Sequence, residues 1–281
     1  MPAPTPREFV CPLCLGELAP SPDGGLGCPA CAREAARWDP GDGVLDFIGE
    51  REPEVRGVGP KLMHSPILAR LYQRFWRPVF TAVAGGRPHD LAEELALVDR
   101  ALAPAEGGLV LDLSCGPGHA ARHFAGGGRF GAVHGVDWSL AMLRQCRALC
   151  RDDGIDDVLL VRADVARLPY RSGSVAGVHA GAALHLWPDP AAAAAEIARV
   201  LRPGGAFIAS TFAHRRGRVF QAIEGAFQTI STSRVFHEEE LVGLFAAHGL
   251  VDAEVMRRGS LILLWGRRAG APAAAAAPSP A

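Results

Sequence analysis

Short apolar runs alternate with helical patterns along most of this chain, and this alternation constrains its fold more than any other feature. The runs are 109–113, 132–136, 158–161, 175–178 and 206–211, and helical spacing of apolar residues occurs between them at about 118–125, 139–152 and 190–201. Strands that are apolar on both faces are typical of a parallel sheet, and the intervening helices cover each side. The sequence therefore predicts an α/β fold.

The two ends of the chain differ from this central pattern. Helical spacing recurs at 65–83 and at about 89–103, before the first run. After the last run come a helical pattern near 238–248 and two apolar segments around Gly259, which predict an antiparallel hairpin at the sheet edge. We therefore expect a cysteine-rich module over 1–48, a linker with N-terminal helices over 49–104, the α/β domain over 105–268 and a disordered Ala/Pro tail over 269–281.

A glycine-rich turn follows the first apolar run, in the stretch LDLSCGPG at 111–118. Glycines at positions 116 and 118 let a ligand approach the backbone, and the start of the following helix favours negative charge. Taken alone, the turn also matches the dinucleotide-binding fingerprint, and it could be no more than a tight connection between strand and helix.

Carboxylates stand at the ends of the next two runs. Asp137 lies nineteen residues beyond Gly118 and can accept hydrogen bonds from both hydroxyls of a ribose. Asp164 ends the third run, where a carboxylate can accept from the amino group of adenine. Together with the glycine turn, these positions predict a nucleoside-containing ligand across the ends of three neighbouring strands.

The ordered set of LDLSCGPG, VHGVDWSLAML, ADVARLPYRSGSV and LHLWPDPAAAAAEIARVLRPGG resembles the class I S-adenosylmethionine methyltransferases, in particular the ubiquinone/menaquinone-biosynthesis branch. The resemblance implies a Rossmann-like, seven-stranded, mostly parallel sheet with a C-terminal antiparallel hairpin, and S-adenosylmethionine as cofactor. It also implies a cofactor site formed by Asp112, Ser114, Cys115, Gly116 and Gly118 around the methionine part, Asp137 at the ribose, Trp138, Met142, Asp164 and Val165 at the adenine, and Ala180 and Gly181 after the fourth strand.

Four of the seven cysteines form two CxxC pairs near the start, Cys11 with Cys14 and Cys28 with Cys31. Two such pairs supply four thiolates, which suit a tetrahedral structural zinc ion in a zinc-ribbon-like module. Disulfides are the alternative, but an odd number of cysteines argues against a disulfide framework. We therefore predict structural zinc and a reducing, cytoplasmic compartment.

The zinc module has two possible uses. The arrangement resembles the bacterial rRNA guanine methyltransferases, which join a zinc module to the same catalytic fold and so suggest RNA docking. However, residues 1–50 hold three arginines against eight carboxylates, a net charge of −5, whereas a phosphate-binding surface should be basic. We therefore favour a scaffold role and expect a nucleic-acid partner less than a small-molecule methyl acceptor.

Three residues are candidates for acceptor chemistry. Tyr72 lies in an aromatic helical pattern that resembles the lid helix of the small-molecule enzymes, although such stripes usually pack in a core. His179 and His185 flank the end of the fourth run, where a neutral imidazole could take a proton from the acceptor. A simple loop contact is the alternative for His185. The basic stretch from His214 is expected to be a solvated loop.

Methylation of oxygen or carbon on a hydrophobic or aromatic metabolite is the function that these features favour. An RNA methyltransferase, a non-catalytic cofactor- or partner-binding protein, and a nicotinamide-dependent dehydrogenase are the alternatives. No charge-free apolar run reaches the ~18 residues of a membrane span, and the sequence leaves the oligomeric state open.

Overall fold

The computed structural model describes residues 6–22, 24–49, 91–212, 214 and 234–270. The predicted helix at 65–83 with Tyr72, and the tail from residue 271, lie outside the described residues. None of the described helices is long and apolar enough to cross a membrane.

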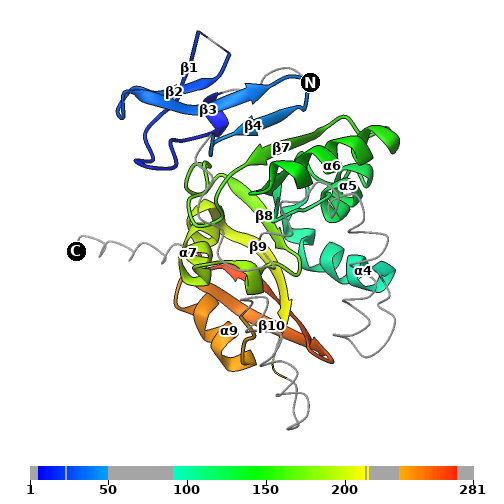
Figure 1. Cartoon of the computed structure of the whole chain (residues 1–281). Coiled ribbons are helices and arrows are strands. Elements are labelled where there is room, and N and C mark those ends of the chain that lie inside the picture. The colour runs from blue at the N-terminus through cyan, green and yellow to red at the C-terminus, as the bar shows by residue number, and fades with distance from the viewer. Residues whose placement is uncertain (1–5, 23, 50–90, 213, 215–233, 271–281) are drawn as a thin grey trace, which may run out of the picture.

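A seven-stranded sheet forms the centre of the molecule (Figure 1). Its strand order is β7-β6-β5-β8-β9-β11-β10. All neighbouring pairs are parallel except those of β11, which runs antiparallel to both β9 and β10. This confirms the predicted mostly parallel sheet with its C-terminal hairpin. The strands are β5 (Leu109–Leu113), β6 (Ala132–Asp137), β7 (Val158–Arg162), β8 (Val175–Ala180), β9 (Leu201–Phe212), β10 (Leu250–Arg258) and β11 (Leu261–Arg268).

Helices cover the two faces of this sheet, and each face has its own apolar cluster. Buried side chains of α4, α5 and α6 join one cluster, whereas those of α7 and α9 join the other. The described helices are α4 (Leu91–Ala101), α5 (His119–Gly126), α6 (Leu140–Asp152), α7 (Pro190–Val200) and α9 (Glu238–Ala246), with short 3-10 helices at Pro6–Glu8, Ala103–Ala105 and Leu184–Leu186.

Local sequence explains where these helices begin. Ser139 caps α6, its hydroxyl accepting a hydrogen bond from the Met142 amide at 3.3 Å. Asp189 caps α7 in the same way through the Ala192 amide at 2.9 Å, and Pro190 occupies the first turn, where no amide hydrogen is needed. Both caps lie just after a strand or loop at the edge of the sheet where the glycine turn also lies.

The N-terminal module extends the same sheet. Its strands β1 (Ala19–Pro20), β2 (Leu26–Cys28), β3 (Arg33–Asp39) and β4 (Val44–Asp46) are antiparallel to one another. The last of them, β4, pairs in parallel with β7, so the sheet has eleven strands in the described residues. The sequence did not predict this pairing. It satisfies the outer edge of β7, which would otherwise present unpaired backbone groups.

An aromatic cluster joins the module to the α/β domain. Phe9 is fully buried, and its ring centroid lies 5.5 Å from that of Phe47 and 5.3 Å from that of Tyr170. The Tyr170 hydroxyl in turn shares a 3.2 Å hydrogen bond with Nδ1 of the buried His134 on β6. The module and the sheet therefore share one core.

We predict that acid unfolds the protein partly through His134. Burial lowers the pKa of His134 to about 4, whereas the unfolded chain takes up this proton near pH 6.5. Stability is therefore lost as pH falls from about 6.5 towards 4, by about 1.4 kcal/mol per pH unit for each such proton. His134→Gln, measured by urea unfolding at several pH values, should show a shallower pH dependence than the wild type. An unchanged slope would contradict the prediction.

Candidate active site

The glycine turn between β5 and α5 adopts left-handed backbone conformations. Ser114, Gly116 and Gly118 have φ values of +54°, +54° and +75°. A Cβ atom on Gly118 would lie 2.1 Å from Sγ of Cys146, so both the conformation and the packing require glycine there. A Cβ on Gly116 would meet nothing within 4 Å, so the backbone at Gly116 borders open space that a ligand can approach.

Asp112 stabilises the glycine turn through hydrogen bonds of both its carboxylate oxygens. Its side chain is buried, and Oδ2 accepts a 2.9 Å hydrogen bond from the Ala121 amide at the start of α5. Its other oxygen, Oδ1, accepts from Nδ1 of His179 at 2.7 Å, across neighbouring strands where the two residues are direct partners. The His179 ring also packs edge-on against Phe124 at 5.6 Å. This geometry makes His179 a support for Asp112 and the turn.

Asp137 connects the turn to the end of β6. Its Oδ2 accepts from the Gly116 amide at 2.8 Å, and its Oδ1 accepts from the Ser139 amide at 2.7 Å. Burial raises the pKa of Asp137 to about 6, although these backbone hydrogen bonds act in the opposite direction. A carboxylate has about four lone-pair positions, so both oxygens can still accept hydrogen bonds from a ribose.

The residues predicted to surround adenine lie at the ends of β6 and β7. Trp138 is half-buried and Met142 is buried one turn further on, in α6. Oδ1 of Asp164 accepts from the Ala166 amide at 2.9 Å, which fixes the carboxylate in a turn after β7. The sheet thus brings Asp137, Trp138 and Asp164 to one edge, next to the glycine turn.

The loop after β8 contains the remaining predicted residues. Ala180 is buried, and a Cβ on Gly181 would lie 2.7 Å from Cε1 of His179, so this ring packs against the Gly181 backbone. His185 is buried in the short helix that follows, with its ring 4.8 Å from that of Phe212 on β9. Burial lowers the pKa of His185 to about 4, so its imidazole is neutral at pH 7.

Trp187 is a site residue that the sequence analysis missed. Its indole Nε1 donates a 2.9 Å hydrogen bond to Oγ of Ser114, and its side chain is buried. The contact fixes Ser114 in its left-handed conformation from a loop 73 residues away in sequence. The aromatic residue next to Pro188 was the available signal, but composition cannot distinguish an indole that donates to the turn from one that only packs.

Comparison with known proteins agrees with this architecture. A family model described as a methyltransferase domain matches residues 111–209. An uncharacterised chloroplastic methyltransferase of Arabidopsis thaliana is 35% identical over 93% of this chain and 78% of its own length, and a second one is 36% identical over 92% and 78%. The chain belongs to the methyltransferase family. A phosphoethanolamine N-methyltransferase 2 of Haemonchus contortus, solved with S-adenosyl-L-methionine, shares the fold with a TM-score of 0.59 at 15% identity, covering 74% of this chain and 60% of that one.

These findings confirm an S-adenosylmethionine-dependent methyltransferase with a Rossmann-like fold. Both Arabidopsis relatives are described as chloroplastic, so the predicted cytoplasmic compartment is not common to the whole family.

The methyltransferase also gathers the four N-terminal cysteines into one cluster, as predicted. Their Sγ atoms all lie within 4.8 Å of one another, with 4.0 Å between Cys11 and Cys31 and 3.6 Å between Cys14 and Cys28. Four thiolates about 2.3 Å from a tetrahedral zinc ion stand about 3.8 Å apart, so the cluster fits such a site. All four thiols are free of disulfides.

We predict that cofactor affinity depends on the ionisation of Asp137. Ribose hydroxyls donate to the ionised carboxylate, so binding is strongest above the Asp137 pKa of about 6 and weakens as pH falls through it, by up to about tenfold per pH unit. Calorimetry with S-adenosylhomocysteine from pH 5 to pH 8 measures this. Asp137→Asn should bind weakly with little pH dependence. Equal pH profiles for the two proteins would contradict the prediction.

Proposed function

We propose that this methyltransferase transfers the methyl group of S-adenosylmethionine to oxygen or carbon of a small hydrophobic or aromatic metabolite. The observation that carries the proposal is the N-terminal module: residues 1–50 have a net charge of −5, and Phe9 and β4 pack into the shared core. An acidic, core-bound module is a poor surface for RNA phosphates.

The names of two relatives support a small-molecule acceptor. A demethylmenaquinone methyltransferase of Lactococcus lactis is 28% identical over 53% of this chain and 59% of its own length. A phthiotriol/phenolphthiotriol dimycocerosates methyltransferase of Mycobacterium tuberculosis is 35% identical over 35% of each chain. Both are named for small molecules, and neither is named for a nucleic acid.

The described residues suggest how this chain would hold the cofactor. In our proposal Asp137 accepts from the ribose, Trp138 and Met142 flank the adenine face, and Asp164 with Val165 meets the adenine edge. The turn with Ser114, Cys115, Gly116 and Gly118, supported by Asp112, and the backbone of Ala180 and Gly181 lie beside the methionine part. The bound sulfonium supplies the methyl group, and alignment of the acceptor with it supplies much of the rate.

We further propose a division of the chain into functional parts. Residues 1–48 form a zinc-ribbon-like module in which Cys11, Cys14, Cys28 and Cys31 hold a structural zinc ion, and a filled four-thiolate site leaves no open position for chemistry. Residues 49–104 supply a linker and lid that carries Tyr72, and 105–268 form the catalytic domain. In such a short module, metal binding contributes much of the folding free energy.

The proposed function is tested by finding which molecules gain label from labelled S-adenosylmethionine. We expect that purified protein, incubated with cell extract, labels the organic-soluble metabolite fraction, and that Asp137→Asn labels it far more slowly. Separation into RNA, protein and metabolite fractions gives the result. Label in RNA would replace the proposal with the RNA methyltransferase alternative, and cofactor binding without any labelled product would favour a non-catalytic protein.

His185 is our proposed general base, because its neutral imidazole lies in the loop after β8. His179 already donates to Asp112, so we assign it the supporting role. His185→Gln should lower kcat by about 100-fold or more, the usual size of general-base effects, without a matching rise in the KM for the cofactor. The control is His248→Gln, in the turn between α9 and β10. Near-normal kcat in His185→Gln would show that alignment of the acceptor with the cofactor is sufficient and that no general base is needed.

A further inference from the structure

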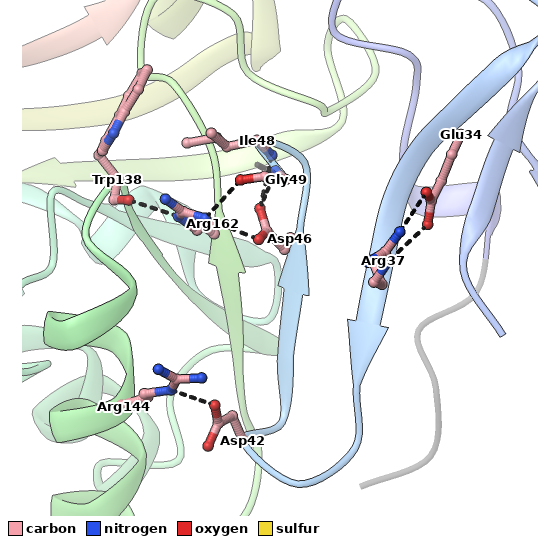
Figure 2. A network of polar contacts seen from close by, with 9 residues as sticks. All are labelled: Glu34, Arg37, Asp42, Asp46, Ile48, Gly49, Trp138, Arg144 and Arg162. Carbon is pink, nitrogen blue, oxygen red and sulfur yellow. Dashed lines mark hydrogen bonds and ion pairs between the residues drawn. The ribbon is translucent and has the colours of Figure 1, made fainter. Parts of the chain in front are cut away.

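Arg162, the last residue of β7, connects the N-terminal module to the cofactor edge of the sheet (Figure 2). Its side chain is only 6% exposed. Nη1 donates to Oδ2 of Asp46 in the module at 3.0 Å and to the carbonyl of Gly49, the first residue after the module, at 3.1 Å. On the other side, Nε donates to the carbonyl of Trp138 at 3.0 Å.

The strands place Arg162 in one row with residues of both parts. Asp46 on β4, Arg162 on β7 and Asp137 on β6 are direct partners across the sheet. The amide after Arg162, that of Ala163, donates to the carbonyl of Asp137 at 3.2 Å. Asp164 follows one residue later. Arg162 therefore lies next to Asp137, Trp138 and Asp164, three of the residues that we assign to the ribose and the adenine.

Two backbone hydrogen bonds orient the Asp46 carboxylate toward the guanidinium of Arg162. Its Oδ1 accepts from the amides of Ile48 at 2.8 Å and Gly49 at 2.9 Å, which leaves Oδ2 directed at the guanidinium. When its carboxylate partner is removed, a buried guanidinium remains charged but unpaired, which is strongly destabilising. The side chain of Arg162 is then expected to shift. Because the same guanidinium holds the carbonyl of Trp138, a shift of Arg162 changes the backbone between β6 and α6.

We propose that Arg162 is a positioning residue through which the N-terminal module sets the affinity of the cofactor site. The module places Asp46, Asp46 fixes Arg162, and Arg162 fixes Trp138 and the end of β7. The inference rests on the proposed placement of the adenosine at Asp137, Trp138 and Asp164. Such coupling is reciprocal, so the bound cofactor also stabilises the pairing of the module with β7.

The chain offers a matched control at the other end of β4. Asp42 forms an ion pair with Arg144 of α6, which also joins the module to the α/β domain (Figure 2). Both side chains of this pair are substantially exposed, at 31% for Asp42 and 55% for Arg144. Like Asp46 and Arg162, this control pair joins an aspartate of the module to an arginine of the α/β domain. It lies before β4, however, away from the strand end that carries Arg162.

The test compares Asp46→Asn with Asp42→Asn in the full chain. Asparagine at position 46 keeps an oxygen for the Ile48 and Gly49 amides but loses the ion pair with Arg162. Calorimetry with S-adenosylhomocysteine should show about tenfold weaker binding for Asp46→Asn, within the usual range of coupling between sites, and wild-type binding within about twofold for Asp42→Asn. Thermal unfolding identifies folded variants, and KM for S-adenosylmethionine should rise with little change in kcat.

Arg162→Lys provides a second variant that keeps the charge. A lysine lacks the planar fork that bonds Asp46 and the Trp138 carbonyl together, so it should weaken binding as Asp46→Asn does. Wild-type affinity in folded Asp46→Asn, or equal loss in both aspartate variants, would overturn the inference and leave the proposed function in place. Failure of the wild type itself to bind S-adenosylhomocysteine would overturn the proposed cofactor site and the inference together.

Discussion

The parallel pairing of β4 with β7 is the contact on which the organisation of this methyltransferase depends. It turns β7 from an edge strand into an interior one, bonded to β6 on one side and to the module on the other. An unpaired edge at that place would leave backbone groups exposed beside the residues that we propose for the cofactor. The same pairing brings Asp46 within reach of Arg162 and puts Phe47 beside Phe9. The cysteine module is therefore part of the catalytic sheet.

The donor side of the site is assembled by the protein's own hydrogen bonds. Asp112 binds α5 and His179, Asp137 binds the turn and the start of α6, and Trp187 binds Ser114. In the proposed cofactor site, each bond fixes a group that the cofactor would otherwise have to order on binding, and ordering of flexible groups reduces affinity. A turn with three left-handed residues is maintained because the surrounding contacts over-determine it.

The features that depend on local sequence pattern could be predicted from the sequence. The apolar periodicity located the strands of the seven-stranded sheet within a few residues, and the CxxC spacing located the cysteine cluster. The sequence analysis missed β4, because a strand of three residues carries almost no periodicity and its partner lies more than a hundred residues away. It also missed the roles of Trp187 and Arg162, because each is set by a partner distant in sequence: Ser114 for Trp187, and Asp46 for Arg162.

The same register changes how His179 is understood. From sequence, its position after a buried run favoured contact with the acceptor, but the pairing of β5 with β8 places it opposite Asp112. Ser210 is also engaged, because its hydroxyl accepts from the Ala182 amide at 2.7 Å. His179 and Ser210 thus bind the protein itself, whereas Oγ1 of Thr211 on β9 has no hydrogen-bond partner among the described residues, and the buried ring of His185 packs on Phe212. Because His179 and Ser210 are engaged within the protein, we propose that the acceptor is recognised mainly through apolar contact and shape, with His185 as the polar group that meets it.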